Sequence, residues 1–199
     1  MGPTIAILLA AGESRRMGQL KALLPSQGSI LLEHQVNALL EGGVGHVVTV
    51  LGHRAPELEA RLKGKRGVSW IVNPDYTQGK TTSLKAGIQI ANRFQPASIL
   101  ILNVDQPRKP ETVRELLLVH ETGDSLITIP TFDGKGGHPI LLASELLPEI
   151  EDIEEESQGL KAVTLRHGDS ISRVDLAVPD VLWDLNTPED YQKAVSTHG

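Results

Sequence analysis

The segment 9–21 combines small side chains with cations in a pattern that suits phosphate binding. An apolar run at 5–9, typical of a buried strand, is followed by three small residues at 10–12 and then by a loop that carries Arg16 and Lys21. Small residues let backbone N–H groups approach a ligand closely, and the glycine among them can adopt a positive φ. Because backbone N–H groups and converging cations both stabilise anions, the segment predicts a cradle for a polyphosphate.

Better-known motifs do not match this loop. Gly12 and Gly18 lack the G-x-G-x-x-G spacing of a dinucleotide-binding loop, and Gln19 stands where a P-loop requires lysine. The tripeptide Gly-Lys-Thr at 79–81 resembles the end of a P-loop, but Pro74 occupies the position of its first glycine. The residues at 12–16 also lack the second glycine of a nucleophile elbow.

Asp105 is the strongest candidate for a metal ligand. It follows the run 98–104, the most continuous stretch of β-branched and leucine residues, and Pro107 and Pro110 prevent that strand from continuing. Mg²⁺ is commonly held by one or two carboxylates together with substrate phosphates. A turn or a helix cap is the other role that an aspartate before a proline can play, and the residues alone leave both open.

Strand-like and helix-like segments alternate along the chain. This alternation predicts a single α/β domain over residues 1–199, with a mostly parallel twisted sheet, helices on both faces and ligands at the carboxyl ends of the strands. The segments expected as strands are 5–9, 47–51, 68–72, 98–104, 126–130, 139–142 and 181–185, and those expected as helices are 31–40, 56–62, 84–91 and 112–120.

The composition excludes several classes of protein. A net charge of −6 argues against general nucleic-acid binding, and the absence of cysteine excludes disulfides and thiol nucleophiles. The apolar run at 5–11 is too short to span a membrane and has no basic residues before it, so we expect neither membrane insertion nor a signal peptide. A cytoplasmic location follows as the expectation.

Five segments together resemble a known family. Their sequences are similar to those of nucleotidyltransferases that attach a nucleotide to molybdopterin, a family within the superfamily of nucleotide-sugar pyrophosphorylases. The resemblance implies a Rossmann-like nucleotidyltransferase fold, an enzyme, and Mg²⁺ as cofactor. It also implies a nucleoside triphosphate and a molybdopterin-type molecule as substrates, with a molybdoenzyme as a protein client. The segments are 9–21, 73–87, 104–107, 136–139 and 184–191.

The same resemblance implies roles for individual residues. Catalysis is expected from Arg16, Lys21 and Asp105. The second substrate is expected at Gly137 and His138. The metal is expected at Asp105 with Asn186 or Asp184. The nucleotide is expected to contact Leu9, Ala10, Ala11, Gly12, Lys21, Asn73, Ser83 and Asp105.

The chain departs from the family pattern at two of these places. The family commonly has Asp-x-Asp before Thr-Pro-Glu-Asp, whereas this chain has Asp184 and Asn186, so a neutral amide replaces a carboxylate. In a strand these two side chains would share a face, and both could then reach the metal. Thr187 is expected to cap the following helix. Lys80 stands where the family has an apolar residue, and its role stays open.

The reaction implied by the resemblance is transfer of a nucleotidyl group to the terminal phosphate of molybdopterin, with release of pyrophosphate. Ala11 favours CTP as the donor, because the guanylyl branch more often has glycine there. Three alternatives remain: a guanylyltransferase of the same family, a transferase acting on a sugar phosphate or another phosphorylated acceptor, and a non-catalytic protein that delivers cofactor to a molybdoenzyme.

Three further expectations concern residues outside the predicted chemistry. Thr81 and Thr82 are expected to cap a helix that Ser83 opens. The acidic run 149–156 is expected to be a solvated helix end or loop rather than a metal site. Arg15, next to Arg16, is expected to point into solvent.

Overall fold

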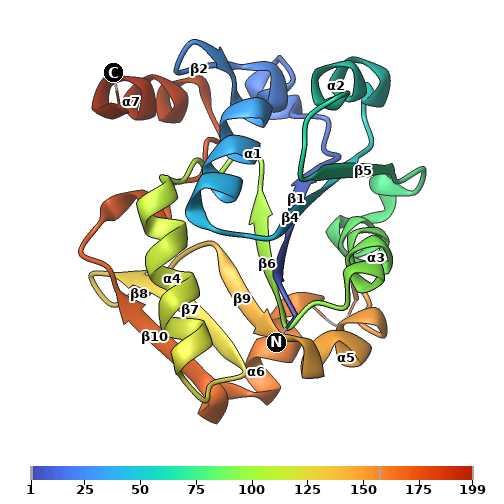
Figure 1. Cartoon of the computed structure of the whole chain (residues 1–199). Coiled ribbons are helices and arrows are strands. Elements are labelled where there is room, and N and C mark those ends of the chain that lie inside the picture. Colours follow the sequence, from blue (N-terminus) through green and yellow to red (C-terminus); the bar gives the residue numbers. More distant parts are fainter. Residues whose placement is uncertain (1, 157, 199) are drawn as a thin grey trace.

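A central sheet with helices on both faces forms the molecule, in a computed structural model that describes residues 2–156 and 158–198 (Figure 1). The strand order is β10-β7-β9-β6-β1-β4-β5, with β8 paired to β7. The strands are β1 (Thr4–Ala10), β4 (His46–Leu51), β5 (Val68–Val72), β6 (Ser98–Asn103), β7 (Ile127–Phe132), β8 (Lys135–Gly136), β9 (Ile140–Ala143) and β10 (Ile171–Asp175), while β2 (Pro25–Ser26) and β3 (Ser29–Ile30) form a separate hairpin.

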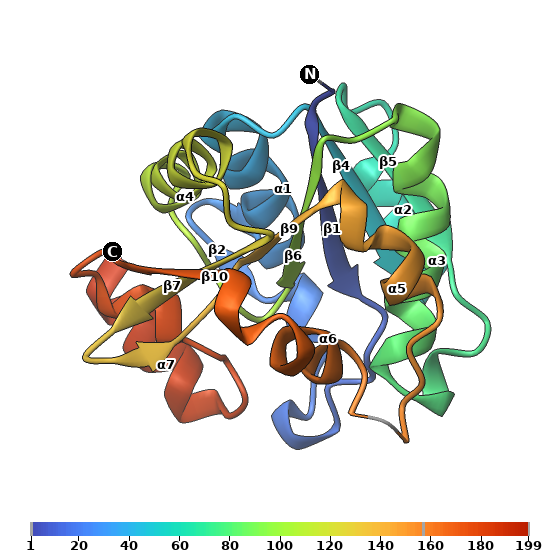
Figure 2. The same cartoon turned by 90° about the horizontal axis from the view of Figure 1, so that it is seen from below.

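The apolar side chains of β1 divide between two cores because successive strand residues point to opposite faces. Ala6 and Leu8 belong to the core beneath α1 and α4, whereas Ile5 and Ile7 belong to the core beneath α3 and α5. Seen from below, these two pairs of helices lie on opposite sides of the sheet (Figure 2). The helices are α1 (Leu31–Gly42), α2 (Ala55–Leu62), α3 (Lys80–Ala91), α4 (Pro110–Thr122), α5 (Leu147–Glu151), α6 (Leu160–Arg166) and α7 (Pro188–His198).

The direction of β9 determines at which edge of the sheet the loop before β9 lies. β1 pairs in parallel with β4 and β6, so their carboxyl ends form one edge of the sheet. β9 pairs antiparallel with β6, and its first residue, Ile140, lies opposite Ile101. The loop that leads into β9 therefore arrives at the same edge as the loops that follow β1 and β6.

The expected fold class is confirmed, with corrections near the carboxyl terminus. The strand expected at 181–185 is wrong, because a short 3₁₀ helix (Pro179–Leu182) occupies its start and no regular element follows until α7. β10, α5 and α6 were not expected. Thr187 caps α7 as predicted, since its Oγ1 accepts the Asp190 N–H while Oδ2 of Asp190 accepts the Thr187 N–H. Among the described residues no helix is long and apolar enough to cross a membrane.

Candidate active site

The loop after β1 is built to turn sharply beside an open space. Ser14 and Gly18 adopt left-handed backbone conformations, with φ of 56° and 72°. Gly12 has no positive φ, so this loop does not use the conformational freedom of that glycine. The space beside it is open, because a Cβ built at Gly12 meets no heavy atom within 4 Å. Oγ of Ser14 accepts the backbone N–H of Lys21 at 3.0 Å, which holds the two ends of the loop together. The loop thus leaves space over its backbone at position 12.

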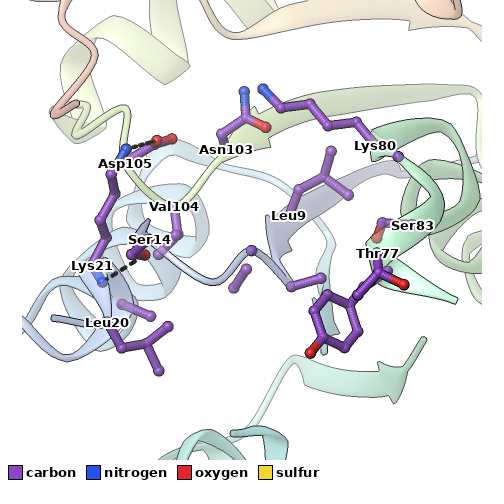
Figure 3. Close-up of a pocket in the computed structure, with 16 residues that line it drawn as sticks. Leu9, Ser14, Leu20, Lys21, Thr77, Lys80, Ser83, Asn103, Val104 and Asp105 are labelled. Atoms are coloured by element: carbon purple, nitrogen blue, oxygen red, sulfur yellow. Dashed lines mark hydrogen bonds and ion pairs between the residues drawn. The ribbon is translucent and has the colours of Figure 1, made fainter. Parts of the chain in front are cut away.

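A cavity of about 280 Å³ lies over this loop at the carboxyl ends of β1 and β6 (Figure 3). Of the residues expected to contact a nucleotide, Asn73 alone is missing from its wall. Residues that the sequence analysis did not select, such as Ser14, Tyr76 and Asn103, also line it. The residues of the expected set in the wall are Leu9, Ala10, Ala11, Gly12, Lys21, Ser83 and Asp105.

Lys21 connects the loop to the other side of the cavity. Its Nζ lies 2.6 Å from Oδ2 of Asp105 and 3.2 Å from Oδ1 of Asn186. Nη2 of Arg16 donates to the same Asn186 oxygen at 2.9 Å. Arg15 is exposed and pairs with Glu13, as expected for a residue outside this cluster. The structure therefore brings together four of the residues selected for catalysis and metal binding, from three distant parts of the sequence.

The oxygens of Asp105 and Asn186 fit a divalent cation. Both lie within hydrogen-bond distance of Nζ of Lys21, so the two oxygens are close enough to share one cation; the ammonium group occupies this point, and a metal ion would bind beside it. Carboxylate and amide oxygens are hard donors of the kind that Mg²⁺ prefers. The pair is not a complete protein cage, and no group of three or more His, Asp or Glu side chains suited to a metal occurs in the described part of the chain. Such a set would depend on substrate phosphates for its other ligands.

Asp184 lies apart from this pair. The segment 184–186 is not a strand, so the predicted alignment of its side chains on one strand face is wrong. The segment is docked by its backbone, because the N–H of Leu185 donates to the Asp105 carbonyl at 2.8 Å. Asp184 is exposed and lines a neighbouring cavity, whereas Asn186 is half-buried beside Lys21. Of these two residues, Asn186 is therefore the one that shares Lys21 with Asp105.

Asn73 positions Ser83 instead of facing the cavity. The Asn73 side chain is buried, its Nδ2 donates to Oγ of Ser83 and to Oγ1 of Thr82, and its Oδ1 accepts the Asp75 N–H. Ser83 lines the cavity, whereas Asn73 does not. Asn73 is therefore placed to hold Ser83, and its contact with a nucleotide stays a prediction.

The start of α3 is held by a distant carboxylate. The helix begins at Lys80, so Thr81 and Thr82 lie within its first turn and the prediction that they cap it is wrong. Oε2 of Glu155 accepts the Thr81 N–H at 2.9 Å. Hydrogen bonds from Thr81 lower the pKa of Glu155. The acidic run 149–156 is mostly exposed, as expected, but it also supplies this cap.

A buried arginine, missed by the sequence analysis, organises the other side of the site. Arg108 is 2% exposed, and its guanidinium donates to the carbonyls of His138 and Val181 at 2.7 and 2.8 Å. It also donates to Trp183, two residues before Leu185. Burial lowers the pKa of Arg108 to about 10, so it stays charged at neutral pH. The sequence offered one signal for this role: Arg108 directly follows Asp-Gln-Pro at the end of a predicted strand.

Arg108 fixes the loop expected to meet the second substrate. The N–H of Gly137 donates to the Pro130 carbonyl and that of His138 to the Val181 carbonyl. His138 lines a second cavity of about 520 Å³, whereas Gly137 is buried against Val181, where a Cβ would lie 2.2 Å from its carbonyl oxygen. Burial lowers the pKa of His138 to about 4, with the charges of Arg108 and Lys80 acting in the same direction. Its imidazole is therefore neutral at pH 7.

The fold is that of a nucleotidyltransferase. The chain belongs to the MobA-like NTP transferase domain family, whose model matches residues 6–171. A relative of 30% identity, covering 93% of this chain and 92% of its own length, is the molybdenum cofactor cytidylyltransferase of Escherichia coli (strain K12). Another, also 30% identical and covering 92% of each chain, is the nicotine blue oxidoreductase of Paenarthrobacter nicotinovorans.

Solved structures agree with the fold. A nucleotidyl transferase from Methanothermobacter thermautotroptrophicus matches with a TM-score of 0.83 and 27% identity, covering 98% of this chain and 97% of its own. Rv0371c from Mycobacterium tuberculosis H37Rv, in a complex with manganese, matches with a TM-score of 0.77 and 20% identity, covering 98% and 99%. The predicted family, fold class and enzyme class are thereby confirmed.

Proposed function

We propose that this enzyme transfers a cytidylyl group from CTP to the terminal phosphate of a molybdopterin-type acceptor, releasing pyrophosphate. The observation that carries the proposal is the Lys21–Asp105 pair, which stands in the wall of a cavity beside the small-residue loop and next to a second, larger cavity. The first cavity would hold the triphosphate and the second the acceptor. The E. coli relative, named for the same reaction, supports this choice.

The chemistry proposed needs positioning and charge rather than a protein nucleophile. An oxygen of the acceptor phosphate forms a bond to the α-phosphorus, and the bond from that phosphorus to the oxygen bridging the β-phosphorus breaks. The electron pair leaves with pyrophosphate. Lys21 and Arg16 would stabilise the negative charge that develops there, and the backbone of the loop at 10–12 would hold the phosphates in line.

Asp105 and Asn186 would hold a divalent ion, with Mg²⁺ as the proposed metal. Bound there, the ion would neutralise phosphate charge and polarise the bond that breaks. The converging oxygens of the two residues support this assignment, and Asp184 is the alternative source of a charged ligand. The manganese complex of a structural neighbour is consistent with a divalent metal in this fold.

The base preference proposed for the donor rests on Ala11. This residue is 6% exposed, lines the first cavity and has a methyl group where the guanylyl branch more often has glycine. A methyl group there reduces the space available to a base. CTP is therefore proposed over GTP, with guanylyl transfer as the alternative.

Pyrophosphate release should be measured with each of the four ribonucleoside triphosphates, Mg²⁺ and purified molybdopterin. The proposal expects release that needs both CTP and molybdopterin, and a cytidylylated product by mass spectrometry. Faster turnover with GTP would assign the enzyme to the guanylyl branch, and turnover only with sugar phosphates would replace the acceptor. Tight molybdopterin binding without release from any triphosphate would indicate a delivery protein instead.

A further inference from the structure

Two cavities share a wall at the carboxyl edge of the sheet. The first, of about 280 Å³, lies over the β1 loop, and the second, of about 520 Å³, lies between the sheet and the segments 153–155 and 158–164. Leu9, Lys80 and Asn103 line both. A group transfer between ligands in the two cavities must take place at this wall, because the reacting atoms have to approach to about 3 Å.

Lys80 is the cation at this wall. It is the first residue of α3, and Figure 3 shows its side chain extending across Leu9 with the ammonium group directed toward Asn103. Within the described part of the chain Lys80 forms no ion pair, whereas Lys21 at the other end of the first cavity is held by Asp105. Glu155 acts on Lys80 through a longer-range charge interaction that lowers the pKa of Glu155, and the ammonium group keeps its hydrogen-bond donors for a ligand.

The other charged groups around the second cavity are less suited to bind an anion at the wall. Glu155 and Asp184 are negative and repel one, while His138 is neutral at pH 7. Lys161 is positive, but it lines only the second cavity. Among the described residues, Lys80 is the one cation that lines both cavities. An anionic group that is brought to the wall from the second cavity therefore meets Lys80.

We propose that Lys80 binds the phosphate monoester of the acceptor and holds it beside the α-phosphorus of the nucleotide. The ligand class is a phosphate monoester whose remaining body fills the second cavity, between the apolar side chains of Ile101, Ile129 and Ile140 and the segments 153–155 and 158–164. This inference rests on the proposed division of the two cavities between donor and acceptor. It adds a specific ligand for the acceptor phosphate, distinct from the cations assigned to the triphosphate.

Steady-state kinetics of Lys80→Met, with acceptor and CTP varied separately, test the assignment. Loss of a charge-assisted contact should raise the KM for molybdopterin about tenfold, with the KM for CTP changed less than twofold. Lys80→Arg, which retains the charge, should recover most of the acceptor affinity. Lys85→Met is the matched control, because Lys85 lies on the same helix and lines neither cavity. A rise in the KM for CTP alone would assign Lys80 to the triphosphate and overturn the inference.

Calorimetry with inorganic phosphate tests the same contact without turnover. Titration into protein saturated with a non-hydrolysable CTP analogue should show phosphate binding that Lys80→Met weakens about tenfold and Lys85→Met leaves unchanged. Equal phosphate binding by the wild type and Lys80→Met, or no binding by the wild type, would overturn the inference. If the wild type binds phosphate through Lys80 but does not use molybdopterin, the proposed acceptor is wrong while the role of Lys80 stands.

Discussion

Nζ of Lys21 lies 2.6 Å from Oδ2 of Asp105, although the two residues are 84 positions apart in the sequence. The ammonium group is largely buried, with the Lys21 side chain 10% exposed, so the carboxylate compensates a charge that would otherwise be costly to bury. The pair joins the loop after β1 to the end of β6. A triphosphate that enters the cavity would meet a cation already held in place, which reduces the entropy lost on binding.

Asp105→Ala should abolish turnover, because it removes both the charged metal ligand and the partner of Lys21. We expect a loss of at least a hundredfold in kcat/KM, about 3 kcal/mol. Thermal melting should show a folded protein with a lower Tm, since Lys21 is left buried without its partner. Asp105→Asn keeps the shape and should show the same catalytic loss with a smaller change in Tm. Wild-type rates in either folded variant would refute the metal role.

Asn186→Leu should lower activity and raise the Mg²⁺ concentration needed for the half-maximal rate. It removes the oxygen that accepts hydrogen bonds from Arg16 and Lys21 and that we assign to the metal. Asn186→Asp should keep activity and need less Mg²⁺, because it adds a charge. Metal titrations of these variants, with Asp184→Asn alone and in combination, form a double-mutant cycle. Unchanged Mg²⁺ dependence in Asn186→Leu would shift the assignment to Asp184.

The native enzyme should prefer CTP over GTP by on the order of a hundredfold in kcat/KM, because a mismatched base leaves buried hydrogen-bonding groups unpaired. Ala11→Gly should narrow this difference by enlarging the cavity next to the β1 loop. Competition between the two nucleotides at limiting concentration measures the ratio directly. A native preference for GTP would contradict the cytidylyl assignment.

Stability should fall on acidification partly through His138. Its folded pKa of about 4 lies below the unfolded value near 6.5, so between these values the unfolded chain binds more protons. The free energy of unfolding therefore decreases as the pH falls from about 6.5 toward 4. Urea unfolding at pH 7 and pH 5 should show a smaller decrease for His138→Gln than for the wild type. Identical decreases in the two proteins would argue against a buried neutral imidazole.

Glu155→Gln should destabilise the fold by about 1 kcal/mol, because it replaces a charged acceptor at the amino end of α3 with a neutral one. Oε2 of Glu155 accepts the Thr81 N–H, so the change acts on the helix that carries Ser83 and Lys80. Chemical denaturation gives the free energy of unfolding. Glu156→Gln, an exposed neighbour in the same acidic run, serves as the control and should change it by less than half as much.

Local sequence patterns predicted the elements with strong apolar content. The runs at 5–9 and 98–104 correspond to β1 and β6, because a strand covered on both faces needs an unbroken apolar sequence. β10 escaped prediction because it lies at the sheet edge, where Ser172 and Arg173 interrupt the pattern. α5 has only five residues, too few to show a helical period.

Local sequence patterns could not predict the contacts between segments that are distant in the sequence. Residue patterns selected Lys21 and Asp105, and the family resemblance added Asn186. Asn186 reaches the other two because the neighbouring Leu185 N–H donates to the Asp105 carbonyl. Arg108 lies in a stretch of charged and proline residues that is typical of a surface loop. Its burial becomes intelligible only when the backbone carbonyls around it, from three separate segments, are known.

The reversed direction of β9 has a consequence for how such a scaffold can evolve. The parallel strands β1, β4 and β6 carry the loop over the first cavity, whereas the loop at 137–139 reaches the shared edge on β9, which pairs with β6 on one side and β7 on the other. Substitutions at Ile129, His138 or Ile140 can therefore change the lining of the second cavity without changing a residue of β1, β4 or β6. Such substitutions would change which molecules the second cavity accepts while the first cavity keeps its lining.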